Sequence, residues 1–156
     1  KSKSNHIKSL FSIMENTISG SDTKIGDILH VSAESIKKRG LVILISDFFD
    51  DVESIVSGIK HYRYKGNEVI VFYVLDPKEL NLSFDERTEF IDLETGESIT
   101  TDPWHIQNDY NKKMIGFCKT LELNCKKNKV DYTRITTETP VEVALFDYLL
   151  KRQKIN

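Results

Sequence analysis

The sequence lacks the long apolar runs and the charge imbalance that mark two large classes of protein. No apolar stretch among its 156 residues approaches the roughly 20 residues that a helix needs to cross a bilayer. The first residues, Lys1 to Asn5, contain no apolar segment of a signal peptide. Its 22 Lys and Arg do not outnumber its 24 Asp and Glu, whereas dedicated nucleic-acid binders carry a clear basic excess. We therefore expect a cytoplasmic protein with no membrane segment and no nucleic-acid partner.

Cysteine is scarce as well, and the two that occur cannot pair with each other. Cys118 and Cys125 lie seven residues apart in a segment with helical periodicity. That separation is about 10.5 Å along a helix axis, whereas the Cα atoms of a disulfide lie within about 7 Å. We expect both cysteines to be reduced and buried.

Two unbroken apolar runs are the clearest structural signals in the chain. Residues 41–45 read LVILI and residues 69–75 read VIVFYVL. Without polar alternation, such runs are typical of parallel strands that are covered on both faces. A helical pattern over residues 52–59 lies between them and completes a βαβ unit. The sequence therefore predicts an α/β fold with a Rossmann-like parallel sheet.

The remaining segments predict further elements around this unit. Apolar faces at helical spacing occur over residues 7–18 and 25–36, with Ser21 to Thr23 as a cap and Lys37 to Gly40 as a C-terminal signal. Residues 88–93 and 98–101 predict a β-hairpin. A long helix from Asp102, a strand over 131–135 and a helix after Pro140 follow. We expect a single domain over residues 1–156.

Carboxylates follow both predicted strands. Asp47 and Asp76 end the two runs, and Asp50, Asp51 and Glu79 come soon after. Ligands of open α/β folds bind at the carboxyl edge of the sheet, and clustered oxygens suit Mg²⁺. Aspartates after strands also cap the next helix, and Asp50 and Asp51 are placed to do so. A metal site and a capping role are both open from the sequence.

Catalytic signatures are missing. The four histidines are scattered and show no metal-ligand spacing, and no glycine-rich phosphate loop or Ser-His-Asp signature is present. Enzymes usually place a nucleophile or base beside a bound metal, and none is evident. The sequence therefore favours a non-enzymatic protein.

Several segments together resemble one family. They are RGLVILISDFFDD, NEVIVFYVLDPKEL, FIDLETGE, Tyr110, VDYTRITTETP and YLLKR. They resemble the bacterial "domain of unknown function 58" family, which is similar to von Willebrand factor A domains. The resemblance implies a three-layer, Rossmann-like parallel sheet with an inserted β-hairpin near residues 88–101.

The resemblance also implies a metal-ion-dependent adhesion site. Thr23 and Asp47 match two of its ligand positions, whereas its DxSxS segment, which the family places upstream, is not in this sequence. With no initiator Met either, we expect a partial domain, truncated at its N-terminus, that binds Mg²⁺ or another divalent cation weakly or not at all, unlike its full-length parent. Further matches to the family signature, of unassigned role, are Asp76, Pro77, Glu79, Asp92, Glu94 and Gly96.

The function that the resemblance implies is a protein-interaction module that works with a MoxR-type AAA+ ATPase. The alternative is a metal-dependent hydrolase or phosphotransfer domain that uses Asp47 and Asp76, and a structural fragment without a site is a third possibility. The truncation would leave the LVILIS strand bare at the sheet edge. We expect another copy of the chain, or the N-terminal helix, to cover that edge.

Overall fold

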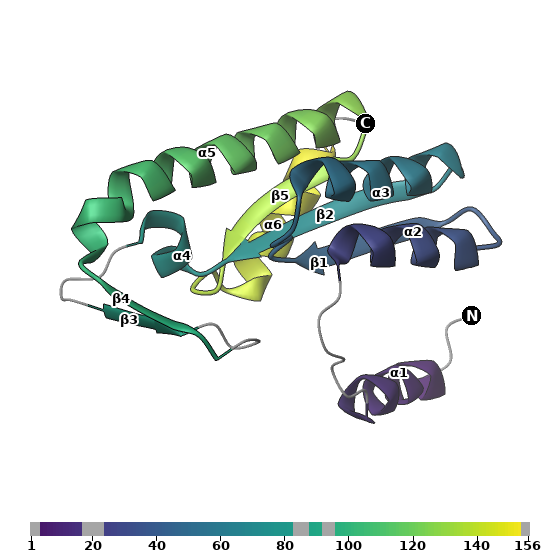
Figure 1. Ribbon diagram of the computed structural model, residues 1–156. Coiled ribbons are helices and arrows are strands. Elements are labelled where there is room, and N and C mark those ends of the chain that lie inside the picture. Colours follow the sequence, from purple (N-terminus) through teal and green to yellow (C-terminus); the bar gives the residue numbers. More distant parts are fainter. Residues whose placement is uncertain (1–3, 17–23, 83–87, 92–95, 154–156) are drawn as a thin grey trace.

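The computed structural model describes residues 4–16, 24–82, 88–91 and 96–153 (Figure 1). In chain order its elements are α1 (Ser4–Asn16), α2 (Ile25–Ser35), β1 (Leu41–Ser46), α3 (Val52–Tyr64), β2 (Glu68–Leu75), α4 (Pro77–Asn81), β3 (Thr88–Ile91), β4 (Ser98–Thr101), α5 (Pro103–Lys127), β5 (Asp131–Thr136) and α6 (Val141–Gln153).

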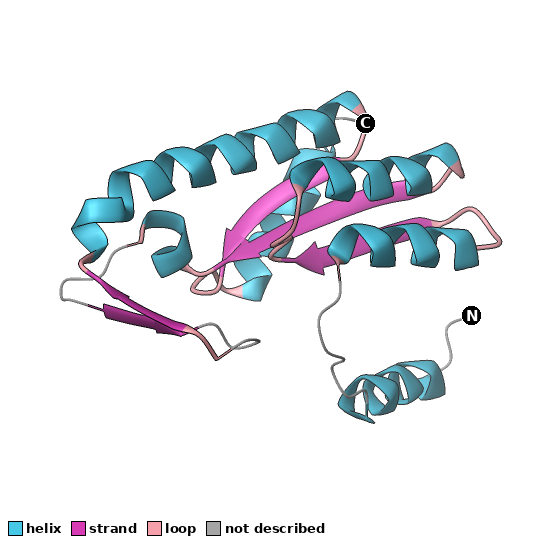
Figure 2. Cartoon of the chain, viewed as in Figure 1, coloured by secondary structure: helices cyan, strands magenta, loops and turns pink. Residues whose placement is uncertain are grey.

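The main sheet is parallel, with strand order β1-β2-β5 (Figure 2). Leu41 pairs with Glu68 at one end of the β1–β2 ladder, and Ile70 pairs with Asp131 in the β2–β5 ladder. The predicted βαβ unit is therefore β1-α3-β2, and the Rossmann-like α/β prediction is confirmed. Because all three strands run the same way, their carboxyl ends meet at one edge of the sheet.

Helices cover both sides of the sheet. Helices α2, α3 and α5 pack on one face and α6 lies on the other (Figure 1). The centre of the core is β2, whose Val69, Val71 and Tyr73 are almost inaccessible to solvent. Cys118 and Cys125 of α5 are free and buried against it, as predicted. Burial raises the pKa of the Cys125 thiol to about 12.

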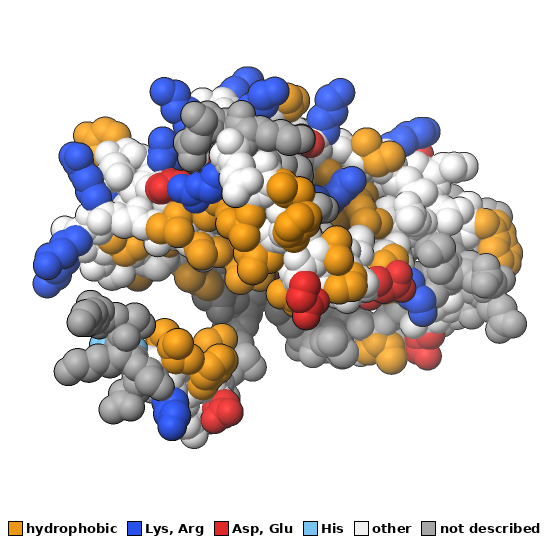
Figure 3. All heavy atoms as spheres, turned by 180° about the vertical axis from the view of Figure 1, so that it is seen from behind, with side chains coloured by type: hydrophobic (Ala, Val, Ile, Leu, Met, Phe, Trp, Pro, Cys, Tyr) orange, Lys and Arg blue, Asp and Glu red, His pale blue; other side chains and the backbone are white. Residues whose placement is uncertain are grey.

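The prediction that both faces of β1 are covered is wrong. Leu41, Ile43 and Ile45 are 51%, 51% and 69% exposed, while Val42 and Leu44 pack on the core. Helix α6 reaches β2, where the Tyr148 ring lies 5.6 Å from that of Phe72, but nothing in the described part of the chain covers this side of β1. An apolar surface therefore remains on the back of the molecule (Figure 3).

Helix α1 does not cover that surface, contrary to one of the two expectations for the β1 edge. It lies apart from the rest of the chain (Figure 1), and its apolar residues Ile7, Leu10, Phe11 and Met14 are exposed. Pairing with another copy stays a prediction.

The C-terminal end of α2 also differs from the prediction. The helix stops at Ser35, and Ile36 already has an extended backbone with φ −77° and ψ 110°. Lys37, Lys38 and Arg39 therefore lie beyond the last turn, too far along the chain to offset its dipole there. The predicted cap, Ser21 to Thr23, lies outside the described residues.

The second half of the chain agrees more closely with the prediction. β3 and β4 form the predicted antiparallel hairpin, and Gly96 has a positive φ of 73° just before β4. The long helix α5 begins after Asp102, and β5 and α6 follow where they are expected. The short helix α4 was not predicted.

Candidate functional site

The loop after β1 turns two neighbouring aromatic rings in opposite directions. Phe48 adopts a left-handed φ of 46° and is 1% exposed, whereas Phe49 is 84% exposed. Short local hydrogen bonds hold the turn: the Phe48 amide donates to Ser46 Oγ at 2.9 Å, and the Asp50 amide donates to the Phe48 carbonyl at 2.8 Å. The loop thus buries one ring in the core and presents the other at the carboxyl edge.

Asp50 and Asp51 hold helices in place. Asp51 Oδ2 accepts from the Ser54 amide at 2.8 Å and caps α3. Asp50 Oδ2 accepts from the Gly26 amide in α2 at 3.1 Å, and Asp50 Oδ1 accepts from the Asp51 amide at 2.7 Å. These backbone hydrogen bonds, that from Gly26 foremost, hold the pKa of Asp50 below its usual value. Asp51 therefore has the expected capping role, whereas Asp50 does not cap α3 and instead accepts from the first turn of α2.

Asp76 and Glu79 form the capping box of α4, with Pro77 in its first turn. Asp76 Oδ1 accepts from the Lys78 amide at 2.8 Å, and Glu79 Oε2 accepts from the Asp76 amide at 2.9 Å. The second oxygen of Asp76 accepts from the Thr137 hydroxyl at 3.0 Å and ties α4 to the segment after β5. Both carboxylate oxygens of Asp76 therefore have structural partners.

Asp47 is an exposed carboxylate at this edge, and its hydrogen bonds are local. Its Oδ1 lies 3.3 Å from Ser46 Oγ and 3.4 Å from the Phe49 amide, which are long hydrogen bonds within the same loop. No group of three or more His, Cys, Asp and Glu suited to a metal ion occurs in the described ranges. The expected convergence of five carboxylates is therefore not found there.

A magnesium ion does not fit the described residues on their own. Mg²⁺ demands near-octahedral oxygen coordination, and Asp47 supplies a single side chain. Thr23, Asp92 and Glu94 lie outside the described residues, while Gly96 is an exposed residue of the hairpin. Gly26 donates its amide to Asp50, so the start of α2 lies beside the loop that carries Asp47.

A pocket of about 380 Å³ opens between this loop and α5. Its walls are mostly apolar and come from the loop, β2 and α5; they are Asp47, Phe48, Phe49, Asp50, Tyr73, Tyr110, Lys113, Met114 and Phe117. Burial raises the pKa values of the Tyr73 and Tyr110 hydroxyls, so both stay protonated at neutral pH. The arrangement offers an apolar cavity with hydroxyl groups in its wall and Asp47 and Lys113 as charges of opposite sign.

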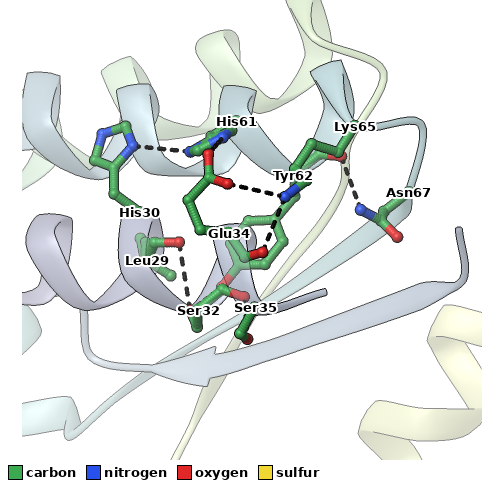
Figure 4. Close-up of polar contacts among 9 residues, drawn as sticks. All are labelled: Leu29, His30, Ser32, Glu34, Ser35, His61, Tyr62, Lys65 and Asn67. Carbon is green, nitrogen blue, oxygen red and sulfur yellow. Dashed lines mark hydrogen bonds and ion pairs between the residues drawn. The ribbon is translucent and has the colours of Figure 1, made fainter. Parts of the chain in front are cut away.

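This pocket could not be predicted from the sequence, because its walls come from segments far apart in the chain. Of its residues, the sequence analysis names Asp47 and Asp50 as carboxylates after the first strand and Tyr110 as part of the family resemblance, without connecting them to a cavity. The sequence also missed a polar cluster between α2 and α3, built from His30, Glu34, His61 and Lys65 (Figure 4). His30 and His61 are 31 positions apart, so no local spacing could connect them.

Comparisons with known proteins place the chain in a fold and a family. A solved structure described as the conserved hypothetical protein BatB from Bacteroides thetaiotaomicron is similar to it, with a TM-score of 0.53 and 21% identity over 94% of this chain and 69% of that one. This likeness supports the fold. No curated protein matches the sequence. None of the helices in the described ranges is both long and apolar enough to cross a membrane. The model of the family described as "protein of unknown function DUF58" matches residues 1–115, and the chain belongs to that family.

Proposed function

We propose that this chain is a non-enzymatic protein-interaction module that docks a protein partner at the carboxyl edge of its sheet. The observation that carries the proposal is the apolar pocket between the 47–50 loop and α5, with the exposed Phe49 ring at its wall. Aromatic anchors and the pockets beside them supply much of the binding free energy in protein interfaces. A large apolar side chain of the partner would fill the pocket while its neighbours cover Phe49.

The partner proposed from the family resemblance is a MoxR-type AAA+ ATPase. A divalent cation, preferably Mg²⁺, held by Thr23 and Asp47, would add a bridge to a carboxylate of the partner. Because Asp47 alone cannot satisfy the ion, this bridge requires oxygen ligands from outside the described residues. The pocket does not depend on the ion, so the two parts of the proposal can be tested separately.

The alternative of a hydrolase or phosphotransfer domain finds no support in the described residues. It requires Asp47 and Asp76 to act together, yet both oxygens of Asp76 already accept hydrogen bonds from Lys78 and Thr137. Asp50, Asp51 and Glu79 are engaged in the same manner. Among the described residues, these carboxylates serve as hydrogen-bond acceptors for neighbouring backbone amides and for the Thr137 hydroxyl.

The test measures binding of the purified chain to the MoxR-type ATPase of the same organism by biolayer interferometry. We expect Phe49→Ser to weaken binding about tenfold or more, because it removes the aromatic anchor. Tyr64→Ser is the matched control, since Tyr64 is 91% exposed but lies at the end of α3, at the opposite edge of the sheet.

Equal binding by Phe49→Ser and the unchanged chain would contradict the docking surface, as would an equal loss with Tyr64→Ser. Asp47→Asn and chelation with EDTA test the metal bridge. Binding that survives both treatments leaves the pocket as the docking site and removes the cation from the proposal.

A further inference from the structure

Two histidines on neighbouring helices point the same ring nitrogen, Nδ1, toward each other. The Nδ1 atoms of His30 in α2 and His61 in α3 are 3.2 Å apart, and the ring centroids are 5.3 Å apart (Figure 4). Two facing lone pairs repel each other, so something must lie between these atoms. It is either a proton carried by one ring or a metal ion bound by both.

Glu34 determines which nitrogen of His61 is available. Its Oε1 lies 2.8 Å from His61 Nε2. Lys65 holds Glu34 in place through its Nζ, which lies 3.3 Å from Glu34 Oε2 and 3.1 Å from the Glu34 carbonyl. A carboxylate can only accept, so His61 Nε2 carries the hydrogen. The neutral ring of His61 then presents the Nδ1 lone pair toward His30.

This arrangement has the geometry of half a tetrahedral metal site. Zinc binds imidazole nitrogen at about 2.0–2.1 Å, and in tetrahedral geometry two such nitrogens lie about 3.3 Å apart. A carboxylate on the far nitrogen of a ligating histidine is the usual second partner in such sites, where it fixes the tautomer and the ring orientation. Glu34 is such a carboxylate, because it lies beside Nε2 of His61, the nitrogen that faces away from His30.

The two helices hold the histidines at this separation. Gly26 lies one turn before His30, and Gly58 one turn before His61, so each glycine shares a helix face with its histidine. At both glycines the other helix comes so close that a Cβ atom would lie 1.8 Å from Ser54 Oγ and 2.5 Å from Leu29 Cβ, respectively. The two helices are therefore closely packed beside the histidines.

We propose that His30 and His61 bind a divalent transition-metal ion of the zinc class between their Nδ1 atoms, with Glu34 orienting His61. The ion takes the place of the Nδ1 proton of His30. The ring of His30 stays neutral because it takes up a proton at Nε2 as it gives up the one at Nδ1. Water fills the remaining positions, since no set of three suitable side chains occurs in the described ranges. Imidazole suits Zn²⁺, Ni²⁺ and Cu²⁺ rather than Mg²⁺, so this site is distinct from any cation at Asp47.

The test titrates the metal-free 156-residue chain with ZnCl₂ by calorimetry at pH 7.5, in two buffers of different ionisation enthalpy. We expect one ion per chain and no net proton release, since each neutral ring keeps one proton at Nε2, so the measured enthalpy should be the same in both buffers. His30→Gln and His61→Gln should each weaken binding about tenfold or more, and Glu34→Gln about tenfold. His6→Gln, on exposed α1, is the control and should bind as before.

Imidazole NMR of the unchanged chain keeps the proposal testable if a variant fails to fold. The Nδ1 resonances of His30 and His61 should move on addition of Zn²⁺, while those of His6 stay. Unmoved His30 and His61 signals at saturating zinc would overturn the proposal, as would full zinc affinity in folded His30→Gln. Loss of partner binding in Phe49→Ser has no bearing on this outcome.

Discussion

At the scale of single residues, Asp50 links the 47–50 loop to α2. Its carboxylate accepts the Gly26 amide, and this bond lowers its pKa. The folded state therefore binds the Asp50 proton more weakly than the unfolded chain does. The stabilisation is present above the usual carboxyl pKa of 3.8 and is lost as the pH falls below it.

We predict that Asp50→Asn lowers the free energy of unfolding by up to about 1 kcal/mol at pH 7, because it replaces a charge-assisted hydrogen bond with a neutral one. The difference between variant and unchanged chain should shrink toward pH 3. Urea denaturation at both pH values measures it. Asp47→Asn is the control and should change little, since its hydrogen bonds are long and exposed. The same difference in free energy of unfolding at both pH values would contradict a stabilising role of the Asp50 charge.

Residue roles at the carboxyl edge could be predicted only where they are local. Asp51 caps α3 because it directly precedes the helix, and its position in the sequence is enough to expect that. The bond from Thr137 to Asp76 joins residues 61 positions apart, and no periodicity encodes it. The Phe48 backbone, with its left-handed φ, likewise depends on the ring being drawn into the core.

At the scale of elements, the α2–α3 contact depends on the missing side chain of Gly58. A Cβ atom there would lie 2.5 Å from Leu29 Cβ, whereas at Gly116 in α5 it would meet nothing within 4 Å. Alanine favours a helix over glycine by about 1 kcal/mol. The two positions therefore separate helix propensity from packing.

We expect Gly58→Ala to destabilise the chain by about 1–3 kcal/mol, because overpacking forces the helices apart. Gly116→Ala should stabilise it by about 1 kcal/mol through the backbone alone. Chemical denaturation followed by circular dichroism measures both. Stabilisation by both substitutions would show that α2 and α3 do not pack as closely as described.

Helices and strands could be told apart from the sequence wherever the pattern of apolar residues was long. The runs of β1 and β2 and the apolar face of α5 predicted their elements correctly. The exposure of one face of β1 could not be predicted from its composition, because a strand buried on one face and a strand buried on both can have the same apolar sequence. The five-residue helix α4 is too short to show a period.

At the scale of the whole molecule, the uncovered edge and back face of β1 form the surface most prone to self-association. Leu41, Ile43 and Ile45 project from a strand whose outer edge pairs with no described strand. Unprotected apolar edges of this kind promote pairing between chains. The predicted self-association through LVILIS therefore has a specific surface.

We predict that the chain forms dimers or larger species at high concentration, and that Ile43→Lys returns it to the monomer. A lysine on the edge adds charge and a strongly hydrated group where a neighbour would pack. Sedimentation velocity over a range of concentrations measures the change. Val31→Lys is the control, on the exposed side of α2. A monomer at all concentrations, with β1 uncovered, would refute the prediction.

The β3–β4 hairpin stands off the end of the sheet, inside the connection between β2 and β5 (Figure 1). The closing cost of a connection grows slowly with its length, by about 0.6 kcal/mol for each doubling. The chain can therefore lengthen, shorten or exchange this stretch while the core keeps its shape. Within the family, this is where new recognition sequences could be acquired by insertion, and it is the natural place to graft a tag or reporter.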